Sequence, residues 1–232
     1  GPKLERPLRD ERDIRSLERY PSLEGVGFVA DAIKLMKKEL GDRTPLIGFA
    51  GSPFTLASYL IEGGGSKEYE HLKTMLYSRP ELLQELLDLL GDQILDYLRM
   101  QVDAGVDAVQ LFDTWGGILH PADYEKHVLP VVRRILDGLK DTGVPRIYFL
   151  KGSAPYNHLV STLDCECFGV DWTQDLTRAI GELPGRCVQG NLDPLVLYGS
   201  HEQVRHRALE ICRQGVAAPG HVFNLGHGIL PH

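Results

Sequence analysis

The sequence has little of what marks secreted, membrane-bound or nucleic-acid-binding chains. Its 232 residues contain only four cysteines and carry a formal net charge of −7. It has no Lys/Arg-rich run, which argues against nucleic acid as a partner. No apolar run approaches the length of a membrane span, and the early stretch "LERPLRDERD" is charged rather than signal-like. We therefore expect a cytoplasmic protein without a membrane or nucleic-acid partner.

The cysteines have no spacing that predicts a disulfide framework or a zinc site. They are Cys165, Cys167, Cys187 and Cys212. The pair at 165 and 167 is not a CxxC motif, and the nine histidines show no HxxxH or HExxH spacing. Reduced thiols in the core are the preferred interpretation, and we expect no metal.

Six short apolar runs alternate with amphipathic segments along the chain. Continuous apolar runs of this length are typical of parallel strands that are covered on both faces. The predicted strands are 45–50, 107–112, 146–150, 168–172, 187–192 and 221–225.

Helix signals fill the intervals between these runs. Prolines at the first helical position, apolar stripes of helical period and a capping-box pattern all occur there. Every predicted strand except the last is followed by such a segment. Helices are predicted to begin at Ser52-Pro53, Arg79-Pro80, Pro121 and Ser200–Gln203. One further helix is predicted over residues 26–40.

Six β/α units indicate either a doubly wound sheet or a (β/α)8 barrel. No Gly-x-Gly-x-x-Gly motif follows the first strand, and polar or glycine residues recur where strands end; both observations favour the barrel. A complete barrel has eight strands, and the last predicted strand lacks its helix. We therefore predict an α/β fold: a single (β/α)8 TIM barrel domain over residues 1–232, incomplete, with six of its eight strands.

In a parallel barrel the functional side chains lie in the loops after the strands. Tyr59 lies in the helix after the first strand and is either a site residue or a core aromatic. Asp113 and Thr114 come directly after the second predicted strand, where an aspartate either faces a ligand or caps the next turn. His227 lies between two glycines after the last predicted strand, which would leave its imidazole open to a ligand.

Further loops allow the same two interpretations. The glycines at 63–65 form either a flexible span over a ligand or a linker, and those at 116–117 permit close approach. Asp171 is another acid at the end of a strand. The segment "QGNLDP" (189–194) is preferably ordinary turn chemistry.

Several of these stretches together resemble the uroporphyrinogen decarboxylase family. The matching segments include "GFAGSPFTLASYLIEGGGS", "VDAGVDAVQLFDTWGG", "GVDWT", "QGNLDP" and "FNLGHG", in family order. The resemblance implies a (β/α)8 barrel that works as a homodimer without a metal or organic cofactor. It implies decarboxylation of the acetate side chains of uroporphyrinogen III to give coproporphyrinogen III, a step of haem biosynthesis.

The resemblance also assigns roles to individual residues. Tyr59, Thr114 and His227 match positions that bind the substrate's carboxylates, and Tyr59 and His227 are the expected catalytic residues. Phe49 and Phe112 match apolar residues that line the cleft.

The family pattern extends beyond this sequence at both ends. The resemblance implies that an N-terminal part is missing, with two strands, carboxylate-binding arginines and an aspartate, and that a closing C-terminal helix is missing too. The six predicted strands are then strands 3 to 8 of the barrel. We expect the chain alone to be inactive. Asp113 aligns with an acidic family position, to which we assign no catalytic role.

Two alternatives stay open. One is a catalytically inactive fragment of such an enzyme that binds porphyrin. The other is a zinc- and corrinoid-dependent methyltransferase of the same barrel superfamily. Those enzymes carry His-x-Cys after a middle strand and Cys after the last, where this chain reads "FLKGSAP" and "NLGHG".

Overall fold

The computed structural model describes residues 3–230, and six strands in it form one parallel sheet. The strands are β1 (Ile47–Gly51), β2 (Ala108–Asp113), β3 (Arg146–Leu150), β4 (Cys167–Gly169), β5 (Cys187–Gln189) and β6 (His221–Val222). They pair in sequential order, and every pairing is parallel. Because such crossovers are right-handed, sequential order places the connecting helices on one face of the sheet, as in a barrel. The predicted α/β fold with six parallel strands is confirmed.

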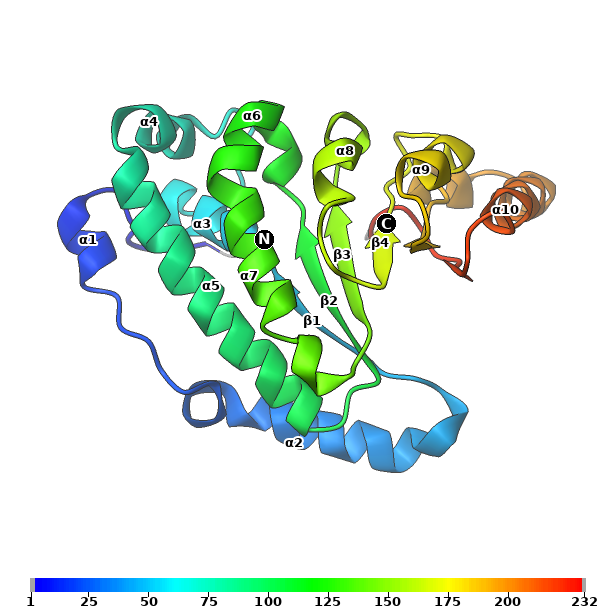
Figure 1. Cartoon of the computed structure of the whole chain (residues 1–232), viewed down its shortest axis with the longest axis horizontal. Helices are drawn as coiled ribbons and strands as arrows, with labels where there is room; N and C mark the ends of the chain where they lie inside the picture. Colours follow the sequence, from blue (N-terminus) through cyan, green and yellow to red (C-terminus); the bar gives the residue numbers. More distant parts are fainter. Residues whose placement is uncertain (1–2, 231–232) are drawn as a thin grey trace.

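Helices cover the outer face of this sheet. Figure 1 shows α5 and α7 beside β2 and β3, with part of β1 behind them, and α2 across the end of the sheet where β1 begins. The helices are α1 (Glu11–Arg15), α2 (Ser22–Leu40), α3 (Pro53–Glu62), α4 (Glu70–Ser78), α5 (Pro80–Asp103), α6 (Pro121–Asp123), α7 (Leu129–Asp137), α8 (Asn157–Val160), α9 (Leu176–Glu182) and α10 (His201–Gly215). A π-helical turn, η3 (Tyr124–Val128), joins α6 to α7, and a 3₁₀ segment, η6 (Pro194–Tyr198), precedes α10.

The predicted helix starts are found, with one difference at α3. Ser200 and Gln203 form the predicted capping box of α10. Ser52 occupies the N-cap position of α3, yet its hydroxyl makes no capping bond and instead donates to Asp113, 2.9 Å away. α5 ends just before Gly105, whose φ of +104° is the left-handed backbone that glycine adopts easily.

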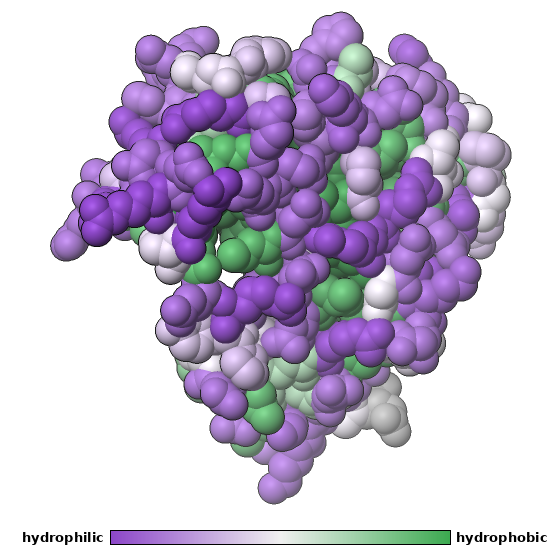
Figure 2. Space-filling model, turned by 60° about the vertical axis from the view of Figure 1, so that its left-hand side comes forward, coloured by the Kyte–Doolittle hydropathy of each residue, from purple (hydrophilic) through white to green (hydrophobic). Residues whose placement is uncertain are grey.

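The core lies between the outer face of the sheet and the helices. Alternate side chains of the strands point to this side, and the apolar stripe of α5 packs on them. Hydrophilic residues cover most of the surface in Figure 2, and apolar residues appear in the hollows between them and at a few exposed places. The large apolar side chains of α2 that are exposed are Leu23, Phe28, Leu35 and Met36. The fully buried side chains include Leu83, Leu86, Leu87, Leu98, Leu111, Tyr148 and Phe168.

The last three strands are shorter than predicted. β4, β5 and β6 end at Gly169, Gln189 and Val222, whereas we predicted strands to 172, 192 and 225. Gly190 follows β5 with a φ of +139°, and a Cβ there would lie 2.4 Å from the Val170 carbonyl oxygen. The chain therefore leaves the strand conformation early, and apolar content alone does not reveal this.

The inner face of the sheet is strongly curved. Gln189 of β5 donates to Gln110 of β2 over 2.9 Å, although two strands separate β2 from β5. At the edge strand β1, Phe49 also points inward and is 60% exposed. The six strands thus form an arc whose concave face is lined by alternate residues, as in the wall of a barrel.

Two predictions from composition have different outcomes. Cys165 and Cys167 are buried, and burial raises the pKa of each thiol to about 12. Cys212 is exposed on α10, so the prediction of core thiols is wrong there. Within residues 3–230, the helices lack the combination of length and apolar character that crossing a membrane requires.

Candidate functional site

A cavity of about 520 Å³ opens at the carboxyl ends of the strands. Phe112, Thr114 and His227, three of the predicted site residues, line it together. Phe49 does not line the cavity, but its ring lies 5.9 Å from that of Phe112. Segments that are far apart in the sequence therefore converge where a barrel places its chemistry.

A row of rings and one ammonium group lies beside this cavity, and of its five residues only His227 lines the cavity itself. Tyr59 packs edge-on against Trp115, with ring centroids 6.4 Å apart. The Lys151 ammonium lies 5.5 Å from the ring centroids of both Trp115 and Trp172. Trp172 in turn meets His227 edge-on at 6.0 Å. We call these five residues the aromatic belt, and it links Tyr59 to His227 through the loops after β2, β3, β4 and β6.

Close backbone packing holds the loops of the belt together. A Cβ at Gly117 would lie 2.1 Å from the Lys151 carbonyl oxygen, and one at Gly226 would lie 2.4 Å from the Trp172 nitrogen. A close approach does occur at 116–117, but the group that approaches Gly117 is the backbone of Lys151. By contrast, nothing lies within 4 Å of a Cβ at Gly228. Of the two glycines beside His227, Gly226 therefore permits a close contact with the Trp172 backbone, whereas Gly228 has open space around it.

Asp113 is a buried hydrogen-bond hub at the end of β2. Its carboxylate accepts from the hydroxyls of Ser52 (2.9 Å), Thr55 (2.7 Å) and Tyr148 (3.3 Å) and from the Gly116 backbone (3.0 Å). Burial raises the pKa of Asp113, and these four donors oppose that shift. The side chain is fully buried and ties the start of α3 to the loop that carries Thr114. The absence of a catalytic role for Asp113 stays a prediction, which is supported by the position of this network on the side of β2 that faces away from the cavity.

Asp171 closes a turn. Its carboxylate accepts from the backbone N–H groups of Gly152 (2.6 Å), Ser153 (3.3 Å) and Thr173 (2.7 Å). Of the two interpretations of this acid, the cap is the one that these bonds support. The bonds join the loop after β3 to the loop after β4, and so fix Lys151 relative to Trp172.

The other ambiguous loops also serve structure. Gly63 ends α3 with a φ of +82°, and a Cβ there would meet Pro7 at 2.5 Å. Asp193 accepts from the Leu195 nitrogen at 2.8 Å, which confirms turn chemistry at that end of "QGNLDP". At the other end, Gln189 is the last residue of β5, so it is not part of the turn, and it lines the cavity.

The imidazole of His227 favours its neutral form. It is half-buried between Phe149, at 6.3 Å, and Trp172. Burial lowers the pKa of His227 and the Lys151 ammonium lowers it further, while Asp171 acts in the opposite direction. A neutral imidazole with one N–H is suited to donate a hydrogen bond to an anion.

Several site residues were missed from the sequence. Trp115, Lys151 and Trp172 belong to the belt, and Gln110 and Phe149 line the cavity. The sequence did carry a signal for Gln110: it is a polar residue within an apolar strand, and in a strand it points to the same face as Phe112, two positions later. Lys151 carried a weaker signal, as the first residue after β3. Within the described chain, no group of three or more His, Cys, Asp or Glu side chains is placed to hold a metal ion.

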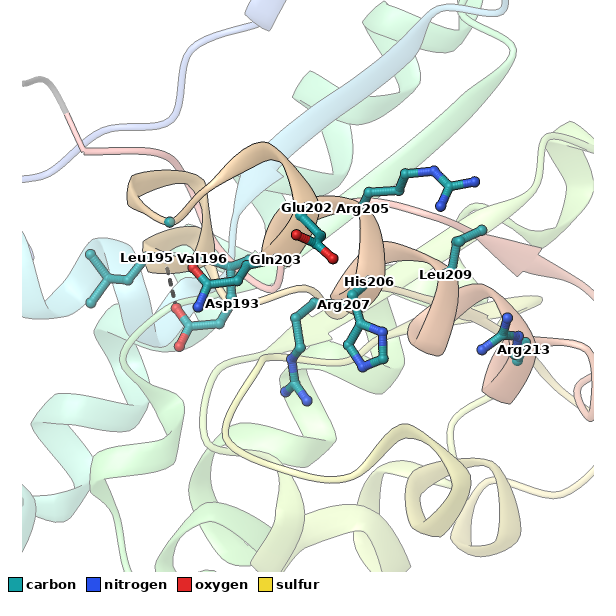
Figure 3. A pocket seen from close by; sticks show the side chains of 11 residues that line it. Asp193, Leu195, Val196, Glu202, Gln203, Arg205, His206, Arg207, Leu209 and Arg213 are labelled. Carbon is teal, nitrogen blue, oxygen red and sulfur yellow. Dashed lines mark hydrogen bonds between the residues drawn. The ribbon is translucent and has the colours of Figure 1, made fainter.

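A second cavity, of about 850 Å³, lies outside the barrel between η6 and α10. Figure 3 shows Arg205, His206 and Arg207 on α10 around it, with Asp193 at the start of η6. It is the larger of the two, but it holds none of the predicted site residues and lies away from the strand ends. We therefore place the site at the barrel mouth.

A curved parallel sheet in sequential order, with side chains converging where its strands end, defines the class of β/α-barrel enzymes. Comparison with solved structures agrees on the fold. A methyltransferase from Methanosarcina mazei superposes with a TM-score of 0.81 at 18% sequence identity, covering 94% of this chain and 64% of that one. At that identity the likeness concerns the fold alone.

The sequence comparisons are more specific. The chain matches the uroporphyrinogen decarboxylase (URO-D) family over residues 1–232. It is 46% identical to the uroporphyrinogen decarboxylase of Syntrophotalea carbinolica and 44% identical to that of Citrifermentans bemidjiense. Each match covers all of this chain and 68% of the relative. The chain belongs to the uroporphyrinogen decarboxylase family.

Proposed function

We propose that the cavity at the barrel mouth binds uroporphyrinogen III and supports removal of CO2 from its acetate side chains. The family match along the whole chain is the observation that carries this proposal. Thr114 and His227, two residues expected to bind carboxylates, line the same cavity, which is consistent with it.

The chemistry needs no external electron acceptor. Protonation of an electron-rich pyrrole carbon gives a cationic ring, which accepts the electron pair released as the C–CO2 bond breaks. A second proton then adds to the exocyclic methylene group and the ring proton leaves, so each acetate becomes a methyl group at the cost of one proton. The substrate thereby serves as its own electron sink, and the protein supplies protons, orientation and charge.

Each predicted residue then has a distinct task. Thr114 and Tyr59 donate hydroxyl hydrogen bonds to carboxylates, and neutral His227 donates its ring N–H. Phe112, with Phe49 against it, supplies an apolar wall from which water is excluded.

Assembly and location belong to the same proposal. A homodimer is supported by the family resemblance alone. A cytoplasmic location is supported by four cysteines that are all unpaired. We also propose that the chain by itself releases no CO2 above background. Turnover by the homogeneous chain would contradict this.

The test uses this sequence within a protein of the relatives' full length, supplied with uroporphyrinogen III. We expect His227→Asn to lower kcat/KM by about 10²-fold, because a substrate misplaced by about 1 Å reacts that much more slowly. His206→Asn is the matched control, since His206 lines the second cavity on α10. Equal activity of the two variants would remove His227 from the site. Stoichiometric bound zinc with methyl transfer in place of CO2 release would instead favour the methyltransferase alternative.

A further inference from the structure

The belt contains a cation that the assigned roles do not use. The Lys151 side chain follows β3 and is half-buried, with its ammonium between the rings of Trp115 and Trp172. No carboxylate within residues 3–230 forms an ion pair with it. The carboxylate of Asp171, the acid of the next loop, is already bonded to three backbone N–H groups.

The backbone around Lys151 is fixed on both sides. Its N–H donates to the Asp113 carbonyl at 3.1 Å, which extends the pairing of β2 with β3 by one residue. The N–H of Gly152 is held by Asp171, and the Lys151 carbonyl lies against Gly117. A long side chain that begins from a fixed backbone and lies between two rings loses less freedom when it binds a ligand.

The residues that line the cavity beside this cation carry little positive charge. Its lining within the described chain includes no lysine or arginine, and His227 favours the neutral form. Lys151 is close enough to His227 to lower the pKa of the imidazole, so its field reaches the cavity rim. An octacarboxylate substrate gains from a cation there. A carboxylate also binds an ammonium more strongly than an indole ring does, so a ligand can displace part of the cation–π contact.

We propose that Lys151 is a substrate-binding residue: Trp115 and Trp172 hold its ammonium at the cavity rim, where it pairs with a carboxylate of the porphyrinogen. This rests on the proposed function. The competing explanation is that Lys151 only joins the two indole loops. In that case its charge contributes to stability and not to ligand affinity.

The two tryptophans of this sequence are Trp115 and Trp172, so intrinsic fluorescence reports on this site directly. The experiment titrates the chain with uroporphyrin III, the oxidised and stable form of the substrate, at low and high salt. Four proteins are compared: the unaltered chain, Lys151→Gln, Lys151→Arg and Lys38→Gln. Lys38 is exposed on α2, at the opposite end of the sheet, and is the matched control for loss of one charge.

We expect Lys151→Gln to weaken uroporphyrin binding about tenfold at low salt, the effect of losing one charge-assisted hydrogen bond. The difference should shrink at high salt, because screening weakens a partly exposed charge pair. Lys151→Arg should keep affinity within about threefold, because it keeps the charge, and Lys38→Gln should bind as the unaltered chain does. Circular dichroism and urea unfolding establish that each variant is folded.

Three results would overturn the proposal. Unchanged affinity of Lys151→Gln removes the residue from the binding site and leaves the proposed function intact. A loss that is independent of salt and equal in Lys151→Arg assigns Lys151 a purely structural role. An unaltered chain with no affinity for uroporphyrin at all, whether in isolation or extended to its relatives' length, refutes the proposed function together with this inference.

Discussion

Gly226→Ala should disturb the site although the substitution adds only one methyl group. The new Cβ would lie 2.4 Å from the Trp172 nitrogen and 3.0 Å from the Asp171 carbonyl carbon. Restoring ordinary contact requires a shift of about 1 Å, and both near atoms belong to the backbone, which cannot rotate away. Overpacking of this kind costs about 1–3 kcal/mol. We expect the free energy of unfolding to fall by that amount.

Gly228→Ala is the matched control within the same three-residue motif. A Cβ at this position meets nothing within 4 Å. Because alanine restricts the unfolded chain more than glycine does, its effect should lie between zero and a gain of about 1 kcal/mol. The two substitutions are chemically identical and lie on either side of His227, so they differ only in what the methyl group meets.

Urea unfolding followed by tryptophan fluorescence measures both effects. A change in midpoint at constant slope gives the difference in stability. The emission of Trp172 reports directly on the contact that Gly226→Ala disturbs. Equal stability of the two variants would refute the reasoning, because it would mean that the loop carrying His227 is not packed against the loop after β4.

Further substitutions test the hydrogen-bond hub and the imidazole. Asp113→Ala removes the acceptor of four buried donors, of which the Tyr148 hydroxyl keeps Tyr124 as a partner, and should cost more than about 3 kcal/mol. Asp113→Asn should cost only about 1–2 kcal/mol, because the hydroxyls of Ser52 and Tyr148 can turn to accept from the amide; equal losses in urea unfolding would contradict the hub. The pKa of His227 is lower in the folded chain than its usual 6.5, so the unfolded chain binds the proton more readily. Stability should therefore fall as the pH drops below about 6.5, and His227→Gln should reduce this dependence between pH 7.5 and 5.5; an unchanged dependence would mean that other groups cause it.

The parallel α/β fold could be predicted from the sequence because the same pattern of strand and helix signals recurs along the chain. Apolar runs recur six times, helix signals follow all of them but the last, and each supports the same parallel arrangement. Strand ends were less predictable. Gly190 leaves β5 for a contact with Val170, a residue twenty positions earlier, and no local pattern records that contact.

Site residues could be predicted where a sequence motif marked them. They could not be predicted where residues from separate loops come together only in the folded chain. His227 stood out between two glycines, but only the structure separates Gly226, which makes room, from Gly228, which does not. Lys151 becomes a candidate only when Trp115 and Trp172, from different loops, are seen on either side of its ammonium. For Asp113 the sequence allowed two interpretations, a site residue or a structural one. Only the positions of Ser52 and Thr55, which donate hydrogen bonds to its carboxylate, support the structural one.

The bond between Gln110 and Gln189 limits how far a ligand can sink into the molecule. It spans the concave face of the sheet one residue layer below Phe112, so it forms a floor of paired amides under the cavity. A flat, broad ligand placed in this cavity would rest on this floor, with its edges within reach of side chains on the loops. If the proposed substrate binds here, its recognition is peripheral: the substituents of the macrocycle would be bound at the rim, and its centre would only have to fit the depth that Gln110 and Gln189 allow.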